Sequence, residues 1–239
     1  MIYLRNIAFY LTFYGSSIVL VLAAVLAGYF SPVWVRRVCD VWSGVHHWAC
    51  ENLLGIRIVE TGQRPDHQVF YAIKHESFFE AIGLPHLFDY PALFAKQELF
   101  DIPGWGRAAR EYGVIPVARE EGAKALRTMI REARPHVDAG RPIIIFPEGT
   151  RVAHGQRPPL GAGFAALYKL LGLPVVPVAV NSGPTYHNLW KRRGTITIHF
   201  GEEIEPGLAR QEIEARVHSA MNSLNHGNGV ERTSQGQLN

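Results

Sequence analysis

The sequence predicts an α/β domain with a layered, mixed or largely parallel sheet, preceded by an N-terminal membrane-associated helical segment. Two observations support this prediction. Short β-rich runs alternate with helical stretches after Gly55, and an uncharged apolar run occupies most of the first thirty residues. With 239 residues, 47% of them hydrophobic, the chain can bury one substantial core but is short for two ordinary enzyme domains. We therefore expect one main domain with an appendage.

The apolar run extends from Ile7 to Phe30 without a charged residue and exceeds the roughly 20 residues that a helix needs to cross the hydrocarbon core. This length favours a membrane-inserted helix over a buried core helix or a cleaved signal peptide, whose apolar core is usually about 7–15 residues. A single span and a hairpin that dips into one leaflet, bent at residues 28–32, are both compatible with it. Arg36 and Arg37 after the run, against Arg5 before it, favour a cytoplasmic main domain.

A second helix is predicted to begin at Pro32, because the next twenty residues separate into two faces at about 100° per residue. The apolar face carries Trp34, Val38, Val41, Trp42, Val45 and Trp48, and the opposite face carries Arg36, Asp40, His47 and Glu51. This pattern predicts a helix in the membrane interface with its tryptophans at headgroup depth. The alternative is a soluble amphipathic helix packed on the core.

Seven runs after Gly55 are typical of β-strands. They are Ile56–Glu60, Val69–Ile73, Ala92–Ala95, Val114–Val117, Ile143–Phe146, Val175–Val180 and Thr195–Phe200. One helical pattern covers residues 122–139, and another begins after Gly161 and continues through Leu171. We expect membrane-inserted and interfacial helices over residues 1–54, the main domain over 55–226 and a polar, disordered tail over 227–239. The main domain is expected to fold without residues 1–30.

Charge and cysteine content exclude several classes of site. The formal net charge of +3 fits an anionic partner, but this mild excess does not separate nucleic acid from a membrane surface or a phosphorylated substrate. Cys39 and Cys50 both precede the main domain, so neither a disulfide framework nor a multi-cysteine metal site is expected there. The densest histidine pair, His46 and His47, lacks a spaced set of further ligands, and no metal is expected.

A histidine and a carboxylate form the first candidate site, in the run KHESFFE after the strand ending at Ile73. His75 and Glu80 would lie about 140° apart on one helix, so they meet only if His75 precedes a helix and Glu80 lies in its first turn. The carboxylate would then keep one ring nitrogen protonated and leave the other free to accept a proton from a hydroxyl. The alternative is a capping histidine beside an unrelated, exposed glutamate.

Cationic residues follow three other predicted strands. Arg119 ends GVIPVAR and Lys96 ends the run ALFAK; either is suited to a phosphate or to a surface salt bridge. The run FPEGTR places a tight turn before Arg151, and the turn can expose backbone N–H groups, the Thr150 hydroxyl and the Arg151 guanidinium to a phosphate monoester. A purely structural turn is the alternative. The run VPVAVNSG has the pattern of a core strand.

In this order and spacing, KHESFFE, GVIPVAR, FPEGTR and VPVAVNSG resemble the four blocks of the glycerophosphate acyltransferases, in particular the bacterial 1-acylglycerol-3-phosphate acyltransferases. The resemblance covers roughly His75 to Gly183 and implies an acyltransferase-like layered domain after a membrane-associated helical segment. It implies that His75 is the general base and that Glu80, at the position of the family's aspartate, orients it. It further implies acceptor-phosphate binding by Arg119, glycerophosphate binding by Glu148, Gly149 and Arg151, and an acyl-donor or shaping role for Pro177.

The resemblance implies transfer of a fatty acyl group from acyl-CoA or acyl-carrier protein to the sn-2 hydroxyl of 1-acyl-sn-glycerol 3-phosphate, which gives phosphatidic acid. Membrane lipid is an expected partner, whereas no cofactor and no nucleic-acid partner are expected. The expected location is a bacterial inner membrane, with the catalytic domain on the cytoplasmic side. Alternatives are an acceptor that is another lysophospholipid, a lyso-aminolipid or glycerol 3-phosphate, a membrane-tethered thioester hydrolase, and a noncatalytic lipid-binding protein. No G-x-S-x-G motif supports a serine esterase.

Overall fold

The computed structural model describes residues 1–118 and 122–225 and contains a seven-stranded sheet of order β1-β7-β6-β2-β5-β3-β4. The strands are β1 (Ile56–Thr61), β2 (Phe70–Ile73), β3 (Ala92–Lys96), β4 (Ile115–Val117), β5 (Ile143–Ile145), β6 (Val175–Val180) and β7 (Gly194–Phe200). The β6 and β7 strands pair antiparallel, and every other neighbouring pair is parallel. The prediction of a mixed sheet is therefore confirmed, with all seven strands at the expected places.

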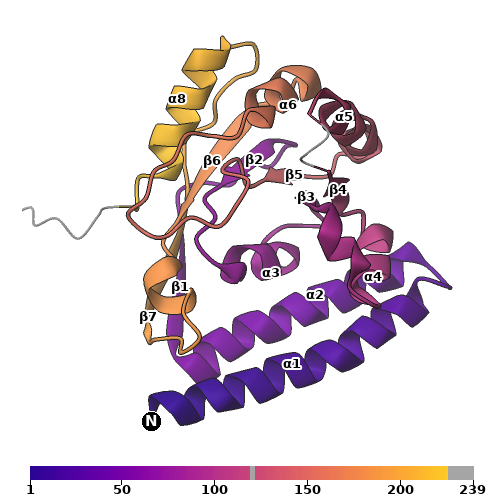
Figure 1. Cartoon of the computed structure of the whole chain (residues 1–239), viewed down its shortest axis with the longest axis vertical. Coiled ribbons are helices and arrows are strands. Elements are labelled where there is room, and N and C mark those ends of the chain that lie inside the picture. Colours follow the sequence, from indigo (N-terminus) through magenta and orange to yellow (C-terminus); the bar gives the residue numbers. More distant parts are fainter. Residues whose placement is uncertain (119–121, 226–239) are drawn as a thin grey trace, which may run out of the picture.

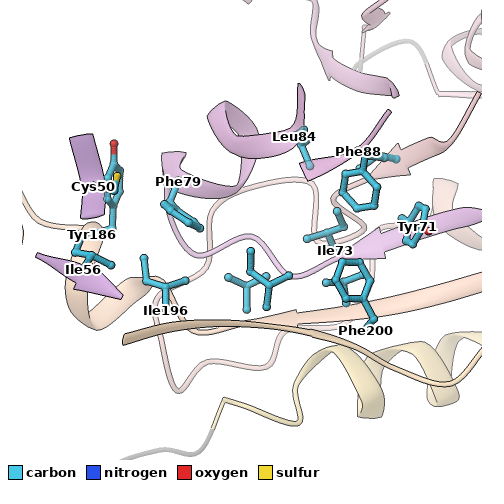
Figure 2. Close-up of a cluster of buried hydrophobic side chains, with 14 of the residues drawn as sticks. Cys50, Ile56, Tyr71, Ile73, Phe79, Leu84, Phe88, Tyr186, Ile196 and Phe200 are labelled. Carbon is cyan, nitrogen blue, oxygen red and sulfur yellow. The ribbon is translucent and has the colours of Figure 1, made fainter. Parts of the chain in front are cut away.

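Two helical layers cover the sheet, one on each face (Figure 1). One layer contains α5 (Ala123–Asp138), α6 (Gly163–Leu171) and α8 (Arg210–Met221); the other contains α1 (Ile2–Ala27), α2 (Pro32–Ala49) and α3 (Phe78–Leu87). Side chains of the central strand alternate between the layers, so Phe70 and Ala72 join the first core while Tyr71 and Ile73 join the second. Figure 2 shows the second core, where Phe79 and Leu84 of α3 face the sheet.

Shorter helices complete the connections between strands. They are η1 (Cys50–Leu54), η2 (Gln97–Asp101), α4 (Trp105–Tyr112) and α7 (Gly183–Tyr186). The chain passes from η1 into β1 through Gly55, whose φ of 70° is the left-handed conformation that glycine adopts without strain. The α5 and α6 helices agree with the sequence prediction, whereas α4, α7 and α8 were not predicted.

The α1 and α2 helices form an antiparallel hairpin beneath α3 (Figure 1). The first turn of α2 is capped by Ser31, whose hydroxyl accepts a hydrogen bond from Val33 N, and Pro32 occupies the first helical position. The polar face of α2 turns toward the domain, where Arg36 pairs with Asp89 after α3. The prediction of two helices with a break at residues 28–32 is confirmed.

One of the three tryptophans of α2 departs from the predicted arrangement. Trp34 and Trp48 are exposed on the outer surface of the hairpin. Trp42 is half-buried between the helices, and its indole N–H donates to Ser17 Oγ at 2.8 Å. Trp42 thus contributes to the packing between α1 and α2, apart from the exposed Trp34 and Trp48.

Candidate active site

His75 and Glu80 are brought together by the start of α3. His75 lies in the four-residue connection after β2, and Glu80 lies in the first turn of the helix. Ser77 caps that helix: its hydroxyl accepts from Phe79 N at 3.1 Å, and its own N–H donates to Glu80 Oε2 at 2.9 Å. The same Oε2 is 3.1 Å from His75 Nδ1. The helix cap thus aims Glu80 back at His75, which is the geometry that the spacing required.

The environment of the pair suits a base with one free nitrogen. The Glu80 side chain is 2% exposed, and its Oε1 accepts a hydrogen bond from the Ser182 hydroxyl, which is also 2.7 Å from Ser77 Oγ. The His75 side chain is 14% exposed, and its ring stacks on Phe146 with centroids 4.1 Å apart. With Nδ1–H directed to the carboxylate, Nε2 is the nitrogen left to accept a proton.

A buried ion pair fixes the backbone on either side of His75. Lys74 is fully buried and donates from Nζ to Glu148 Oε1 at 2.5 Å, to Asn222 Oδ1 at 2.9 Å and to the carbonyl of Gln156 at 3.0 Å. Glu148 Oε2 accepts from His75 N at 3.0 Å, and the His75 carbonyl accepts from Val152 N at 2.8 Å. The turn after β5 is therefore locked to the turn after β2.

Two residues of that turn do not fit the phosphate-binding expectation. Both oxygens of Glu148 are engaged in the buried contacts just described, and a carboxylate would repel a phosphate. The N–H of Gly149, at φ 72°, donates to the Phe146 carbonyl at 2.9 Å and is not free for a ligand. For Glu148 and Gly149 the geometry favours shaping of the turn over contact with the glycerophosphate.

Two of the three expected cations, Lys96 and Arg151, lie at one edge of the sheet. The β2, β5, β3 and β4 strands are parallel, so their carboxyl ends bring His75, Arg151 and Lys96 to the same edge. Arg151 is exposed, with its guanidinium 3.9 Å from the centroid of the Phe78 ring, and Thr150 beside it is also exposed. Lys96 is exposed and pairs in register with Val117, the last residue of β4. Arg119 lies outside the described residues.

Pro177 is buried within β6, opposite Ala72 of the central strand. Its carbonyl accepts a hydrogen bond from Gly201 N at 2.8 Å, and its ring lies against that glycine. Of the two roles considered for Pro177, acyl-donor binding and shape, these contacts favour shape.

Sequence reasoning did not find several polar residues around the site. Ser182, which bonds Glu80, comes from the loop after β6, 102 positions away, and no local pattern pairs the two. Glu76 is fully buried and forms a second histidine–carboxylate pair, with His154 Nδ1 at 2.9 Å and Gly183 N donating at 2.8 Å. Burial raises the pKa of Glu76, and the hydrogen bonds from Gly183 and His154 oppose that rise. Within residues 1–118 and 122–225, no three His, Cys, Asp or Glu side chains are grouped to hold a metal ion.

A small cavity lies between α3 and the sheet and reaches Glu80, with His47, Glu60 and His86 among its other ionisable lining residues. Its volume is about 70 Å³, and its walls include Ile73, Phe79, Leu84, Val180 and Ile198. Gly83 also lines the cavity, and a Cβ built there would meet nothing within 4 Å. The site thus joins an exposed cationic edge to a partly apolar cavity at the carboxylate of the dyad.

This α/β domain, with a histidine–carboxylate pair at the head of a helix, has the features of an acyltransferase. The model of the Acyltransferase family matches residues 55–181, just over half of the chain, and the chain belongs to that family of enzymes. The 1-acyl-sn-glycerol-3-phosphate acyltransferase of Pseudomonas aeruginosa is 29% identical over 207 residues, which cover 83% of this chain and 79% of that protein.

Two further similarities bear on the fold and on the extent of the match. The 1-acyl-sn-glycerol-3-phosphate acyltransferase of Helicobacter pylori is 29% identical over 136 residues, and the chain spans 56% of that relative. The crystal structure of the 1-acyl-sn-glycerophosphate (LPA) acyltransferase PlsC from Thermotoga maritima matches with a TM-score of 0.71 at 21% identity, covering 94% of this chain and 98% of that one. The last similarity shows that the N-terminal hairpin and the α/β domain together form a known fold.

Proposed function

We propose that the protein transfers a fatty acyl group from an acyl thioester to the sn-2 hydroxyl of 1-acyl-sn-glycerol 3-phosphate, giving phosphatidic acid. The observation that carries this proposal is the contact between His75 Nδ1 and Glu80 Oε2, within a family whose relatives above are named for this reaction. The exposed cations at the same edge support an acceptor with a phosphate monoester.

The proposed mechanism uses His75 as a general base. Its Nε2 removes the proton of the sn-2 hydroxyl while the oxygen attacks the thioester carbonyl, and Glu80 stabilises the imidazolium that forms. The tetrahedral intermediate then breaks its carbon–sulfur bond, and the imidazolium returns the proton to the departing thiolate. Every atom of ester and thiol comes from the two substrates, so acyl-CoA or acyl-carrier protein is needed only as the acyl donor.

Acceptor binding is assigned to Arg151, with Thr150, Lys96 and Arg119 as further donors. The guanidinium of Arg151 is planar and suits bidentate binding of a phosphate, and its place above Phe78 keeps it at the head of the helix that begins beside His75. Lys96 and the strand before Arg119 lie at the neighbouring sheet positions. When these residues bind the phosphate of the acceptor, its glycerol backbone extends from them toward His75.

We place the hairpin within one leaflet of a membrane. The α1 helix is the one described helix long and apolar enough to cross a bilayer. Its exposed apolar side chains recur every three or four residues and form a stripe, here called the α1 stripe: Leu4, Ile7, Leu11, Tyr14, Ile18, Leu22 and Leu26. The opposite face is packed on the domain from Asn6 to Ala24. A perpendicular span would carry that domain into the hydrocarbon, so a helix lying along the membrane surface is favoured.

The cytoplasmic side of a bacterial inner membrane is proposed from the arginines that follow the apolar run, Arg36 and Arg37, against Arg5 before it. An acyl-CoA or acyl-carrier-protein donor fits the same side, since both carriers are water-soluble thioesters.

Thiol release from an acyl thioester, measured with and without 1-acyl-sn-glycerol 3-phosphate, tests the function. Acyl transfer requires the acceptor, hydrolysis does not, and a lipid-binding protein releases no thiol. His75→Ala is expected to lower transfer by roughly 100-fold or more, and His67→Ala, at an exposed position before the amino end of β2, serves as the control. Near-normal turnover by a folded His75→Ala protein would exclude His75 as the base. Glycerol 3-phosphate, lyso-aminolipids and headgroup-capped lysophospholipids in the same assay define the acceptor.

A further inference from the structure

A loop far from α1 in sequence is fixed to the N-terminal end of that helix. Residues 187–193, here called the 187–193 loop, join α7 to β7. The buried side chain of Asn6 accepts from Lys191 N at 2.8 Å and donates to the Lys191 carbonyl at 2.9 Å, while the Tyr10 hydroxyl donates to the Leu189 carbonyl. Figure 1 shows the connection between α7 and β7 above this end of α1. The loop is therefore held against the N-terminal end of α1, on the side of Asn6 and Tyr10.

The 187–193 loop continues the apolar surface of α1. Leu189 is 68% exposed and Trp190 is 40% exposed, although both are large apolar side chains. The Trp190 ring meets the exposed ring of Tyr3 edge to face, with centroids 4.8 Å apart, and Leu4 and Ile7 follow on α1. A tryptophan and a tyrosine at the end of an apolar stripe have the composition of a membrane interface.

Cations without carboxylate partners surround this apolar surface. Arg5, Arg192 and Arg193 make no ion pair with any residue in the described part of the chain. A Cβ on Gly55 would lie 2.8 Å from a terminal nitrogen of Arg5 and 2.9 Å from Nε of Arg193, so the two guanidinium groups meet over the bare glycine. Arg5 Nε donates to the Leu53 carbonyl at 2.9 Å, and neither guanidinium group has an ion-pair partner among the described residues. Two like charges this close together favour an anion between them.

We propose that the 187–193 loop and Arg5 form a second membrane contact, in which Leu189 and Trp190 enter the interface and Arg5 and Arg193 bind the phosphate of an anionic phospholipid. This inference rests on the membrane placement in the proposed function. Since β6 ends and β7 begins at the edge of the sheet that carries His75, the contact holds that edge at the level of the lipid headgroups. A lysolipid acceptor then reaches His75 without leaving the bilayer.

The local lipid composition around Trp190 tests the proposal. Full-length protein is reconstituted into phosphatidylcholine vesicles with 30% phosphatidylglycerol, and bromine is placed on the acyl chains of one lipid or the other. The Trp190 signal is the difference between the wild-type protein and Trp190→Phe. We expect this signal to be quenched by both lipids, with a roughly fivefold preference for phosphatidylglycerol over phosphatidylcholine at equal mole fraction.

Charge variants separate a specific site from overall charge. R192E/R193E should lose the preference for phosphatidylglycerol, R192K/R193K should keep most of it, and R131E/R134E, which makes the same charge change on the exposed face of α5, should keep all of it. Equal loss in the two glutamate variants, or a Trp190 signal quenched by aqueous iodide and not by brominated lipid, would overturn the proposal.

Two further measurements distinguish the lipid-binding proposal from donor binding by the loop and from the proposed acyl transfer. If R192E/R193E raises the KM for an acyl-carrier-protein donor but leaves the lipid preference unchanged, the loop binds the acidic donor and the proposal is wrong. Acyl transfer by the wild-type protein in the same vesicles tests the proposed function separately, since the fluorescence result does not depend on turnover.

Discussion

Glu80 serves both the fold and the proposed chemistry. It is the third residue of α3, where a glutamate reaches back to the N–H of the capping residue, and the same oxygen holds the histidine ring. The family resemblance places an aspartate there, which is one methylene shorter. The helix start accommodates the longer side chain because Ser77 and Ser182 hold both of its oxygens.

The first prediction tests whether the charge or the length of the Glu80 side chain matters more for activity. Glu80→Gln keeps the length of the side chain but loses the charge that stabilises an imidazolium, so kcat should fall roughly 100-fold. Glu80→Asp should keep measurable activity, because a carboxylate is retained. Steady-state kinetics with thermal denaturation of each variant provide the measurement. Equal rates for Glu80→Gln and the wild-type protein would eliminate the dyad.

The second prediction concerns the shape of the Arg151 side chain. Arg151→Lys keeps the positive charge but loses the planar guanidinium, so the acceptor KM should rise by roughly 10-fold, equivalent to about 1.4 kcal/mol. The acyl-donor KM should change little. Arg127→Lys, on α5, is the matched control. Unchanged acceptor kinetics for Arg151→Lys would remove this residue from the phosphate site and leave the acyltransferase assignment intact.

The contacts of individual residues show which parts of the site could be predicted from the sequence and which could not. His75 and Glu80 are five positions apart, so their contact follows from one assumption about where a helix begins. Ser182 and Asn222 reach the site from loops or helix ends far along the chain, and their contacts depend on how the strands are ordered. Glu148 was assigned to the glycerophosphate by the family resemblance, whereas in the structure its carboxylate pairs with the buried Lys74.

At the scale of elements, α3 links the dyad to the cavity behind it. The helix carries Glu80 at its start and Gly83 one turn later, on the side that faces the cavity. Residues on the same helical face lie three or four positions apart, so substitutions at Gly83 act on the space next to the dyad.

We propose that the acyl chain enters the cavity beside Glu80, and the third prediction is that Gly83→Leu narrows this space. A Cβ at Gly83 meets nothing within 4 Å, and a leucine also has a better helix propensity than glycine by roughly 1 kcal/mol, so folding should be retained. The ratio of kcat/KM for a long-chain over a short-chain acyl thioester should fall at least about 10-fold. Gly163→Leu, in α6 with equally open space, is the control. An unchanged ratio would show that the acyl chain binds elsewhere.

The contact between the hairpin and α7 contains a buried histidine that responds to pH. His46 is fully buried, its Nε2 is 2.7 Å from the Tyr186 hydroxyl, and its Nδ1 has no hydrogen-bond partner among the described residues. Burial, followed by the charges of His47 and Lys191, lowers the pKa of His46 to about 3. The folded protein therefore holds this ring neutral.

The fourth prediction follows from that pKa. The pKa of a histidine in the unfolded chain is about 6.5, so below this pH His46 binds a proton in the unfolded chain but not in the folded protein. The folded protein therefore loses stability as the pH falls from about 6.5 toward 3. The free energy of unfolding should drop by roughly 1.4 kcal/mol for each pH unit in this window. Urea unfolding in detergent micelles at pH 7 and pH 5 measures the drop, which His46→Gln should reduce and the exposed His67→Gln should not. Identical pH dependence in His46→Gln would contradict the assignment.

At the scale of the molecule, strand positions were predictable but the shape of the N-terminal segment was not. Each β-strand is a short apolar run between turns, and that pattern is local in the sequence. Whether α1 stands across a bilayer or lies along the domain depends on contacts such as Asn6 with Lys191, which join positions 185 apart. The order of the strands, with β7 antiparallel beside β6, depends on the same kind of distant contact.

The fifth prediction reverses the expectation that the domain folds without its first thirty residues. Phe9 and Phe13 of α1 are buried in the core with Phe79, Tyr186 and the strands of the sheet. Removing two buried phenylalanines costs roughly 3–6 kcal/mol, a large share of the 5–15 kcal/mol that stabilises a typical domain.

A protein lacking residues 1–30 should therefore lose cooperative unfolding or melt at least about 10 °C lower in detergent. The double variant Leu11→Ser/Ile18→Ser serves as the control, because it changes exposed positions of the α1 stripe and leaves the buried face intact. This variant should keep the wild-type melting temperature in detergent and bind vesicles more weakly. A truncated protein that melts like the full chain would show that the buried face of α1 adds little to the core and that its function is membrane attachment alone.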